Sequence, residues 1–407
     1  MKKFISLLLV CLMVVPFGML ATTGVSADTA KTVYLSDAGD DANDGSTAAK
    51  AVKTMAKAYE LLNAGGTIVI SGTYTQSAHF FGCDIAHTGK ITIKGADANA
   101  LWEVVGDCRF FLGGVTEITD LKIKNASKTF YFICNFNDFT VTETVTVERV
   151  KDFLINAGGQ NGQQAQDRVY VPKDVTVTIN GGSWVDVIGF TRSGGYPLGA
   201  TAFSADFFKG TDVTFNIGGK ASIDKLYGFS RSASGAAQVF EGASCTVNLN
   251  GGVINKFICM HDINSIRTGI DGGMNVNINK GCDFDKYFKA NVTLDENFYW
   301  QDGSNDRYVF YGLNGCTAWD DNKVAAMGGF IGKSKLVIAD ELYESLKDHE
   351  RIRTESFASI EKAGAQTPDQ PENPGQTPDT GDMTWVVAVV AAVAVMGSAV
   401  VLKKREN

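Results

Sequence analysis

A five-residue motif that could bind a negatively charged sugar occurs twice in this 407-residue chain. Residues 189–193 read GFTRS, and residues 228–232 read GFSRS. An arginine guanidinium pairs with carboxylates, and an aromatic ring offers a face on which a sugar can stack. A surface turn that recurs only because the fold repeats would explain the same residues, with a following aspartate relieving the repulsion between stacked arginines. The candidate binding residues are Phe190, Arg192, Phe229, Arg231 and Asp262.

The two motifs occur among four segments in which apolar and polar residues alternate. The segments begin at Val175, Val213, Cys245 and Met274, so the intervals are 38, 32 and 29 residues. Such intervals leave room for a whole β-coil, whereas an antiparallel sandwich, the alternative, needs hairpin turns. We therefore predict stacked parallel coils whose inward residues are Val177, Phe215, Val247 and Val276 and whose outward residues are Thr178, Asn216, Asn248 and Asn277.

The two arginines lie 17 and 18 residues after the starts of their strands. These equivalent offsets predict that Arg192 and Arg231 lie one above the other on a lateral face of the stack. The largest insertion among these four coils, from Thr191 to Asp212, leaves the stack at the same place. Long insertions often line binding surfaces, so we expect this one to contribute to ligand contact.

The beginning of the chain resembles a known family. Residues 40–46 read DDANDGS, a helix is predicted from Lys53 to about Asn63, and residues 66–74 read GTIVISGTY. This order is similar to the start of many pectate-lyase-like proteins. The resemblance implies an all-β fold, a single right-handed parallel β-helix over residues 28–340. The predicted helix would cap its first coil, which otherwise leaves unpaired backbone groups exposed.

The same resemblance implies a catalytic alternative. Pectate-lyase-like enzymes use acidic residues, often with Ca²⁺, but no motif of a lyase or glycosidase matches this sequence, so the resemblance assigns no catalytic residue and the catalytic residues are unknown. Acidic residues before a glycine also occur in calcium loops, although the chemistry of a tight turn explains the same residues. The calcium candidates are Asp40, Asp41, Asn43 and Asp44, and no other cofactor is expected.

The N-terminal residues predict export. Residues 1–27 contain two lysines, an apolar run and a small-residue end at Ala27, which is the order of a cleaved signal peptide. An uncleaved membrane anchor is the alternative. Toward the other end, residues 341–363 are highly charged and predict a helical cap or spacer. Residues 364–376 are polar and contain prolines, which predicts a disordered linker.

The C-terminal residues 377–407 resemble a cell-wall sorting signal of the Leu-Pro-x-Thr-Gly type. An apolar span from Met383 to Leu402 and a basic tail follow the motif, and the span is long enough to cross a bilayer. The resemblance implies that a sortase cuts between Thr380 and Gly381 and joins Thr380 to peptidoglycan; a plain tail anchor is the alternative. The sortase recognition residues are Thr377, Pro378, Asp379, Thr380 and Gly381.

Composition narrows the partners further. A net charge of -8 argues against nucleic acid, since phosphate binding needs clustered Lys and Arg. Seven of the eight cysteines follow residue 27, and an odd number cannot all pair within one chain.

We expect a surface protein of a Gram-positive-type bacterium that is secreted and anchored in the cell wall. It would be in the membrane only through its apolar span, before sorting. It would bind glycans or host and neighbouring cells without catalysis; a lyase or hydrolase and a purely structural protein are the alternatives.

Overall fold

The computed structural model describes most of the chain between residues 31 and 365. The described ranges are 31–125, 129–149, 152–159, 171–194, 206–233, 238–261, 268–270, 272–288, 334–352, 354 and 357–365. The predicted signal peptide, sorting signal and span lie outside these ranges, and nearly all of the predicted linker does. Within the described ranges, no helix is both long enough and apolar enough to cross a membrane. The chain up to Gly364 forms one compact unit, and a second unit starts at Ala365.

The longest sheet, sheet A, holds one strand from each successive turn of the chain. It is 11-stranded, and its neighbours follow one another in chain order. Its strands are β1 (Thr32–Leu35), β2 (Gly66–Ile70), β5 (Ile91–Gly95), β8 (Thr116–Thr119), β11 (Phe139–Val141), β14 (Val175–Ile179), β17 (Asp212–Ile217), β20 (Ser244–Leu249), β23 (Met274–Ile278), β24 (Lys335–Ile338) and β25 (Ser359–Lys362).

The remaining strands form three further sheets. Sheet B contains β3 (Thr73–Gln76), β6 (Leu101–Val104), β9 (Lys122–Asn125) and β12 (Thr146–Arg149). Sheet C contains β4 (Phe80–Phe81), β7 (Cys108–Phe111), β10 (Phe130–Ile133), β13 (Phe153–Asn156), β15 (Ser183–Ile188), β16 (Thr191–Gly194), β18 (Ser222–Ala233) and β21 (Val253–His261). The last sheet pairs β19 (Gln238–Phe240) with β22 (Thr268–Ile270).

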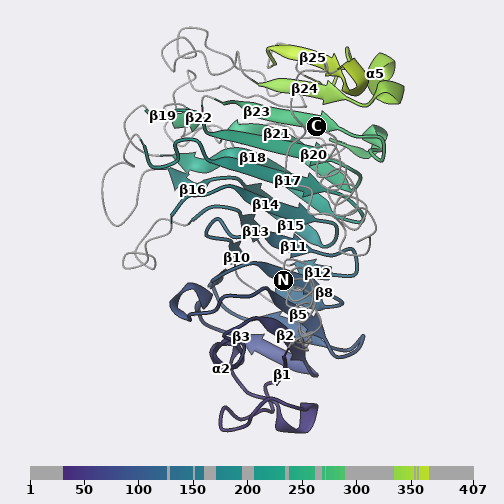
Figure 1. Ribbon diagram of the computed structural model, residues 1–407. Helices are drawn as coiled ribbons and strands as arrows, with labels where there is room; N and C mark the ends of the chain where they lie inside the picture. Colours follow the sequence, from purple (N-terminus) through teal and green to yellow (C-terminus); the bar gives the residue numbers. More distant parts are fainter. Residues whose placement is uncertain are drawn as a thin grey trace, which may run out of the picture. The chain divides into compact units, whose positions relative to one another are not determined.

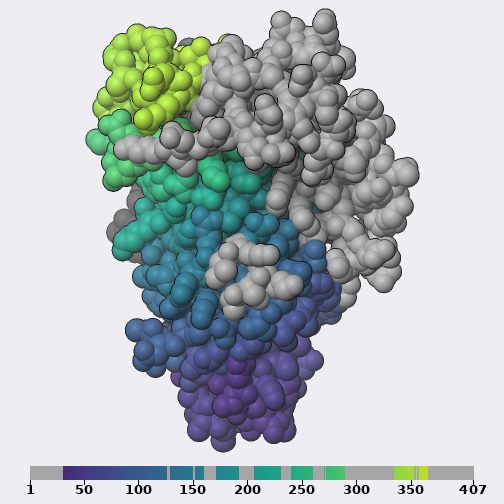
Figure 2. All heavy atoms as spheres, turned by 180° about the vertical axis from the view of Figure 1, so that it is seen from behind, coloured from purple at the N-terminus to yellow at the C-terminus, as the bar shows by residue number. Residues whose placement is uncertain are grey.

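All pairings among the described strands are parallel. From β2 to β13 the chain visits sheets A, B and C in turn and then returns to sheet A one strand further on. Figure 1 shows this progression from β1 to β25, and the surface colours in Figure 2 follow the same chain order from behind. The fold is therefore all-β with parallel strands in long stacked sheets, consistent with a β-helix.

The register predicted for the four alternating segments is confirmed. In the inward column, Val177 pairs with Phe215, Phe215 with Val247, and Val247 with Val276. All four side chains are at most 1% exposed. The outward column pairs in the same order, so the alternation in sequence sets which face of sheet A is buried. Sheet A continues beyond these four segments with β24 at Lys335–Ile338, which pairs in parallel with β23.

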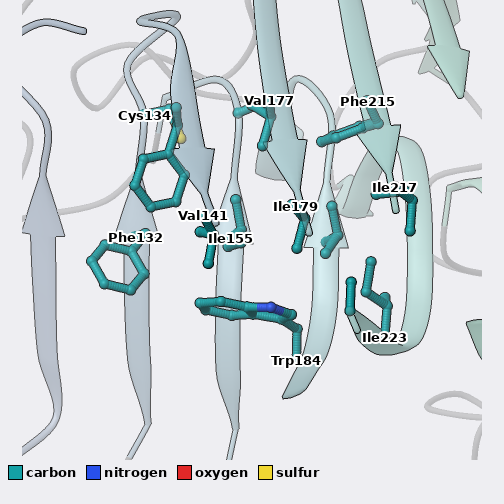
Figure 3. Packing of buried hydrophobic residues seen from close by; sticks show 14 of the residues in the cluster. Phe132, Cys134, Val141, Ile155, Val177, Ile179, Trp184, Phe215, Ile217 and Ile223 are labelled. Atoms are coloured by element: carbon teal, nitrogen blue, oxygen red, sulfur yellow. The ribbon is translucent and has the colours of Figure 1, made fainter. Parts of the chain in front are cut away.

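The interior between the sheets is filled by aromatic and branched side chains. Phe132 on sheet C and Trp184, at the start of β15, pack at 6.1 Å between ring centroids, and Figure 3 shows both rings beside the aliphatic side chains of sheet A. The Trp184 indole N–H donates to the Gly181 carbonyl (2.9 Å), so its polar atom is satisfied although the side chain is fully buried. Cys245 also points inward, and burial raises the pKa of its thiol.

The helix predicted near the beginning of the chain is present and shorter than expected. Helix α2 (Met55–Leu61) starts after Thr54, whose side chain accepts a hydrogen bond from Lys57 N (3.2 Å). Its buried residues, Met55 and Ala58 among them, pack against β1 and β4. The burial of one helix face explains why an isolated segment of only two turns is helical here.

The charged segment 341–363 differs from the predicted helical cap or spacer. Helix α5 (Asp340–Leu346) covers only its beginning, and β25 at its end pairs in parallel with β24. Sheet A therefore continues past residue 340. The physical reason is that β24 offers an unpaired edge, and Ile360 pairs there with Leu336 while its polar neighbours face outward. Lys335 and Glu361 add a cross-strand ion pair (3.8 Å).

Candidate functional site

The two motif arginines lie on neighbouring strands of sheet C. Thr191 pairs with Ser230, and Ser193 pairs with Ser232. This register places Arg192 of β16 opposite Arg231 of β18, as the offsets in the sequence predict. The side chains of both arginines, and the whole of Asp262, lie outside the part of the chain that can be described. Their role as ligand contacts therefore stays a prediction.

The aromatic residues of the same motifs are not on the surface. Phe190 and Phe229 are both 0% exposed and lie in the main core cluster, with 5.5 Å between their ring centroids. Phe208, from the long insertion, packs against Phe190 at 5.3 Å. These rings are inaccessible to a sugar, which corrects the expectation that they stack on a ligand. Their recurrence reflects one core position repeated in successive coils, and Phe208 anchors the end of the insertion to that position.

The four calcium candidates are engaged in turn hydrogen bonds. Asp41 Oδ1 accepts from the backbone N–H groups of Lys53 (2.8 Å) and Thr54 (2.9 Å), which joins the turn to the start of α2. Partial burial acts to raise the pKa of the Asp41 carboxyl, but the hydrogen bonds from Thr54 and Lys53 lower it below its usual value. Asp40 and Asp44 accept from Ala42 N and Ser46 N, and Asn43 donates to the Ala51 carbonyl.

This arrangement is a stabilised turn, which the alternative interpretation of these residues predicts. Nowhere in the described ranges do three or more His, Cys, Asp or Glu side chains gather closely enough to hold a metal ion. Among the cysteines of those ranges, Cys83 is exposed, and Cys108, Cys134, Cys245, Cys259 and Cys282 are buried.

The outer face of sheet A carries a ladder of polar side chains, which we call the amide ladder and which consists of Thr178, Asn216, Asn248 and Asn277. Asn216 Nδ2 donates to Thr178 Oγ1 (3.3 Å), and Asn248 Nδ2 donates to Asn216 Oδ1 (2.8 Å). Asn277 Nδ2 continues the ladder by donating to Asn248 Oδ1 (2.7 Å). An amide has two N–H donors and two acceptor lone pairs. The ladder uses one of each on Asn216 and Asn248, which leaves a donor and an acceptor at each rung for a ligand.

Polar columns flank the ladder on both sides. On one side, residues of the same four strands pair in the order Thr176, Thr214, Thr246 and Asn275. On the other side, Asn279 Nδ2 donates to Asn250 Oδ1 (2.7 Å). The side chains of the amide ladder are half-buried, because each rests on its neighbour in the adjacent coil. The result is a regular surface of hydroxyl and amide groups over β14, β17, β20 and β23.

Aspartates line the edge of this surface where the strands begin. Asp138 Oδ1 accepts from Thr176 N (2.8 Å), and Asp174 Oδ1 accepts from Asp212 N (2.9 Å). Each carboxylate thus satisfies a backbone donor of the next coil, at the point where sheet A starts. Asp174 and Asp212 are exposed, so this edge of the polar surface is negatively charged.

Sheet C carries a buried ion pair that the sequence analysis did not identify. Asp186 of β15 pairs in register with Lys225 of β18, and Lys225 Nζ lies 3.0 Å from Asp186 Oδ1. The side chains are 0% and 11% exposed. Lys225 Nζ also lies 6.0 Å from the ring centroid of Tyr227. This ring belongs to a second hydrophobic cluster on sheet C, which consists of Phe111, Tyr131, Ile133, Leu154, Ile188, Tyr227, Phe257 and Cys259.

A second ion pair connects three coils next to sheet B. Arg149 Nη1 and Nη2 bind the two carboxylate oxygens of Asp224 at 3.1 and 3.0 Å, and Arg149 Nε donates to Ser183 Oγ between them. Asn255 Nδ2 donates to Asp224 Oδ1 (3.0 Å). Burial acts to raise the pKa of Asp224, but the hydrogen bonds from Arg149 and Asn255 outweigh it and lower the pKa below its usual value of 3.8.

This bidentate pair gives a pH-dependent contribution to stability. A carboxyl group with a lowered pKa in the folded state stabilises the fold at pH values above its unfolded pKa, and that stabilisation is lost as the pH falls through the folded value. Asp224→Asn should therefore lower the free energy of unfolding by about 1–3 kcal/mol at neutral pH. In urea titrations, the difference between the variant and the wild type should shrink steadily below about pH 4. A difference that stays constant down to pH of about 2 would contradict this assignment.

No family model, curated protein or solved structure matches this chain. The function therefore has to be inferred from the surfaces described above.

Proposed function

We propose that this chain is a right-handed parallel β-helix, capped at its first coil by α2, that is displayed on a bacterial cell wall and binds glycans without cleaving them. The amide ladder is the observation that carries this proposal. It presents donors and acceptors at equal intervals on an outward face, with 2.7 and 2.8 Å bonds between its asparagines fixing the amide planes. Side chains that are already ordered lose little conformational entropy when a ligand binds.

The chemistry of the surface suits sugar hydroxyls. Each hydroxyl of a sugar is both a donor and an acceptor, and an amide offers both functions side by side. Threonine hydroxyls at Thr214 and Thr246 supply further rotatable donors beside the ladder. Because exposed polar groups exchange water for ligand at a small net gain, each contact is weak, and affinity comes from several contacts made together.

The test is a glycan-array screen of the purified chain from Asp28 to Gly364, with each bound glycan analysed for cleavage products. We expect binding to a subset of glycans and intact sugars after prolonged incubation. Asn248→Ala should weaken that binding, because it removes the central rung, which bonds to both of its neighbours. Unsaturated or shortened products would instead establish the lyase or hydrolase alternative. Absence of any glycan binding would leave a structural role.

Display at the cell wall has a separate test. The motif Thr377–Gly381, the apolar span after it and the basic tail support sortase processing at Thr380. Replacement of Thr380 by alanine should move the protein from the covalent wall fraction to the membrane or medium, as measured by immunoblotting after cell-wall digestion. Replacement of Thr367, which precedes Pro368 as Thr377 precedes Pro378 but lies outside the motif, is the control and should have no effect. Covalent retention of the Thr380 variant would refute the anchoring proposal.

A further inference from the structure

The ligand of the polar surface can be specified further by charge. The outward residues of the four central strands of sheet A carry no cation, and Asp212, the first residue of β17, is their one titratable side chain; the others are Thr176, Thr178, Thr214, Asn216, Ser244, Thr246, Asn248, Asn275 and Asn277. On the same face, lysines lie toward its ends: Lys94 of β5, Lys90 paired with Glu117 (2.9 Å), and Lys335 paired with Glu361 (3.8 Å). The centre of the face therefore gives an anionic sugar no cation to pair with.

The charge at the edge of the polar surface also disfavours an anionic ligand. Asp212 is exposed, begins β17 and shares the outward face with Thr214, and the exposed Asp174 immediately precedes β14, two residues before Thr176. Two carboxylates on adjacent coils produce a negative potential along this edge. A polymer that carries carboxylate or sulfate groups would be repelled, whereas an uncharged polymer would not.

The repeat of the surface indicates the direction of the ligand. Across the strands, the same group recurs at each step of about 4.8 Å, and the four central strands span about 14 Å. Along a strand, the surface ends within a few residues, because Gly218 and Gly219 follow β17 and Gly251 and Gly252 follow β20. A linear polymer whose hydroxyls repeat regularly can contact successive rungs only if it crosses the strands.

From these observations we propose that the polar surface of sheet A binds an uncharged linear polysaccharide, which lies along the amide ladder and across β14, β17, β20 and β23. This inference rests on the glycan-binding function proposed above and adds the class and the direction of the ligand. It also separates this surface from the motif arginines of sheet C, which would suit an acidic sugar.

The experiment is calorimetric titration of the Asp28–Gly364 chain with uncharged β-linked glucose and N-acetylglucosamine oligomers, from disaccharide to hexasaccharide, and with oligogalacturonates of the same lengths. We expect affinity for one uncharged series to rise with length and then level off once the oligomer spans the four strands. The oligogalacturonates should bind at least about tenfold more weakly.

Three variants locate the site. Asn248→Ala should weaken binding of the uncharged oligomer about tenfold, and Asn248→Thr, which restores a hydroxyl of the kind found at Thr178, should recover part of it. Asn99→Ala, on an exposed turn outside sheet A, is the matched control and should leave binding unchanged. Circular dichroism and the unfolding temperature establish that each variant is folded.

The outcomes distinguish this inference from the function on which it rests. If oligogalacturonates bind more tightly and Arg192→Ala with Arg231→Ala abolishes their binding, glycan binding stands and the uncharged ligand is refuted. If uncharged oligomers bind equally well to the wild type and Asn248→Ala, the site is not the amide ladder. If no oligomer of either kind binds, and the array is also silent, both the inference and the proposed function fail.

Discussion

Replacement of Lys225 by methionine should lower the free energy of unfolding by about 3–5 kcal/mol, the largest effect expected for a single polar side chain in this fold. The reason is that Asp186 is fully buried and Lys225 Nζ lies 3.0 Å from its carboxylate. Methionine has a similar volume, so the change removes the positive charge and leaves the packing nearly intact. The measurement is urea denaturation of the Asp28–Gly364 chain at neutral pH.

Two further variants test whether this loss of stability comes from the burial of the ion pair. The double variant Asp186→Leu with Lys225→Met should recover most of the lost stability, since apolar neighbours surround the pair: Leu154 is in register with Asp186, and Phe257 is in register with Lys225. Lys209→Met is the matched control, because Lys209 forms an ion pair of similar length with Glu241 (2.9 Å) while both are exposed. It should cause no measurable change. Equal losses in Lys225→Met and Lys209→Met would show that the burial of the pair has no energetic effect.

Replacement of Gly189 by alanine should also destabilise the protein, by about 1–3 kcal/mol. A Cβ at this position would lie 1.9 Å from the Gly228 carbonyl oxygen in the next coil. The two backbones cannot separate easily, because Gly189 N donates to the Tyr227 carbonyl (2.8 Å) and the Gly189 carbonyl accepts from Gly158 N (2.8 Å). The glycine is thus required by the close approach of two coils.

Gly228→Ala is the matched control for this clash. It adds the same methyl group one coil away, but the nearest atom there is the Met274 sulfur, 2.8 Å from the added Cβ, on a flexible side chain that can move. Thermal unfolding monitored by circular dichroism should show a clearly lower midpoint for Gly189→Ala than for Gly228→Ala. If the two midpoints fall together, local strain in the turn would explain the effect better than contact between coils.

The sequence predicts sheet A well because its strands follow one simple rule. Between Val175 and Ile278, apolar and polar residues alternate in each strand of this sheet. This period of two predicts which side chains face the core, and with them the register in which the strands pair. Sheet C does not follow that rule. In Phe130–Ile133 and Phe153–Asn156 every residue is buried, and a continuous apolar run does not reveal which side faces the core.

In the candidate site, too, some features could be predicted from the sequence and others could not. The amide ladder could be predicted because its residues share one place in an alternating strand. The partnership of Asp186 with Lys225 could not, because it depends on the length of the whole coil between them and on the burial of sheet C. The prediction that Phe190 and Phe229 contact a ligand is wrong for a related reason: a repeated motif marks a repeated position, and at these positions the core requires the repeat.

The parallel stacking of sheet A has a consequence for how this protein can evolve. Each of the four coils that carry β14, β17, β20 and β23 adds one rung to the amide ladder, and its strand in sheet A pairs only with the strand before it and the strand after it. Duplication or loss of a complete coil therefore preserves which residues face inward, because the new neighbours still meet in register. The length of the polar surface can change by recombination within the gene while the fold at both ends stays the same. Chains that differ only in the number of such coils would carry polar surfaces of different length on the same scaffold.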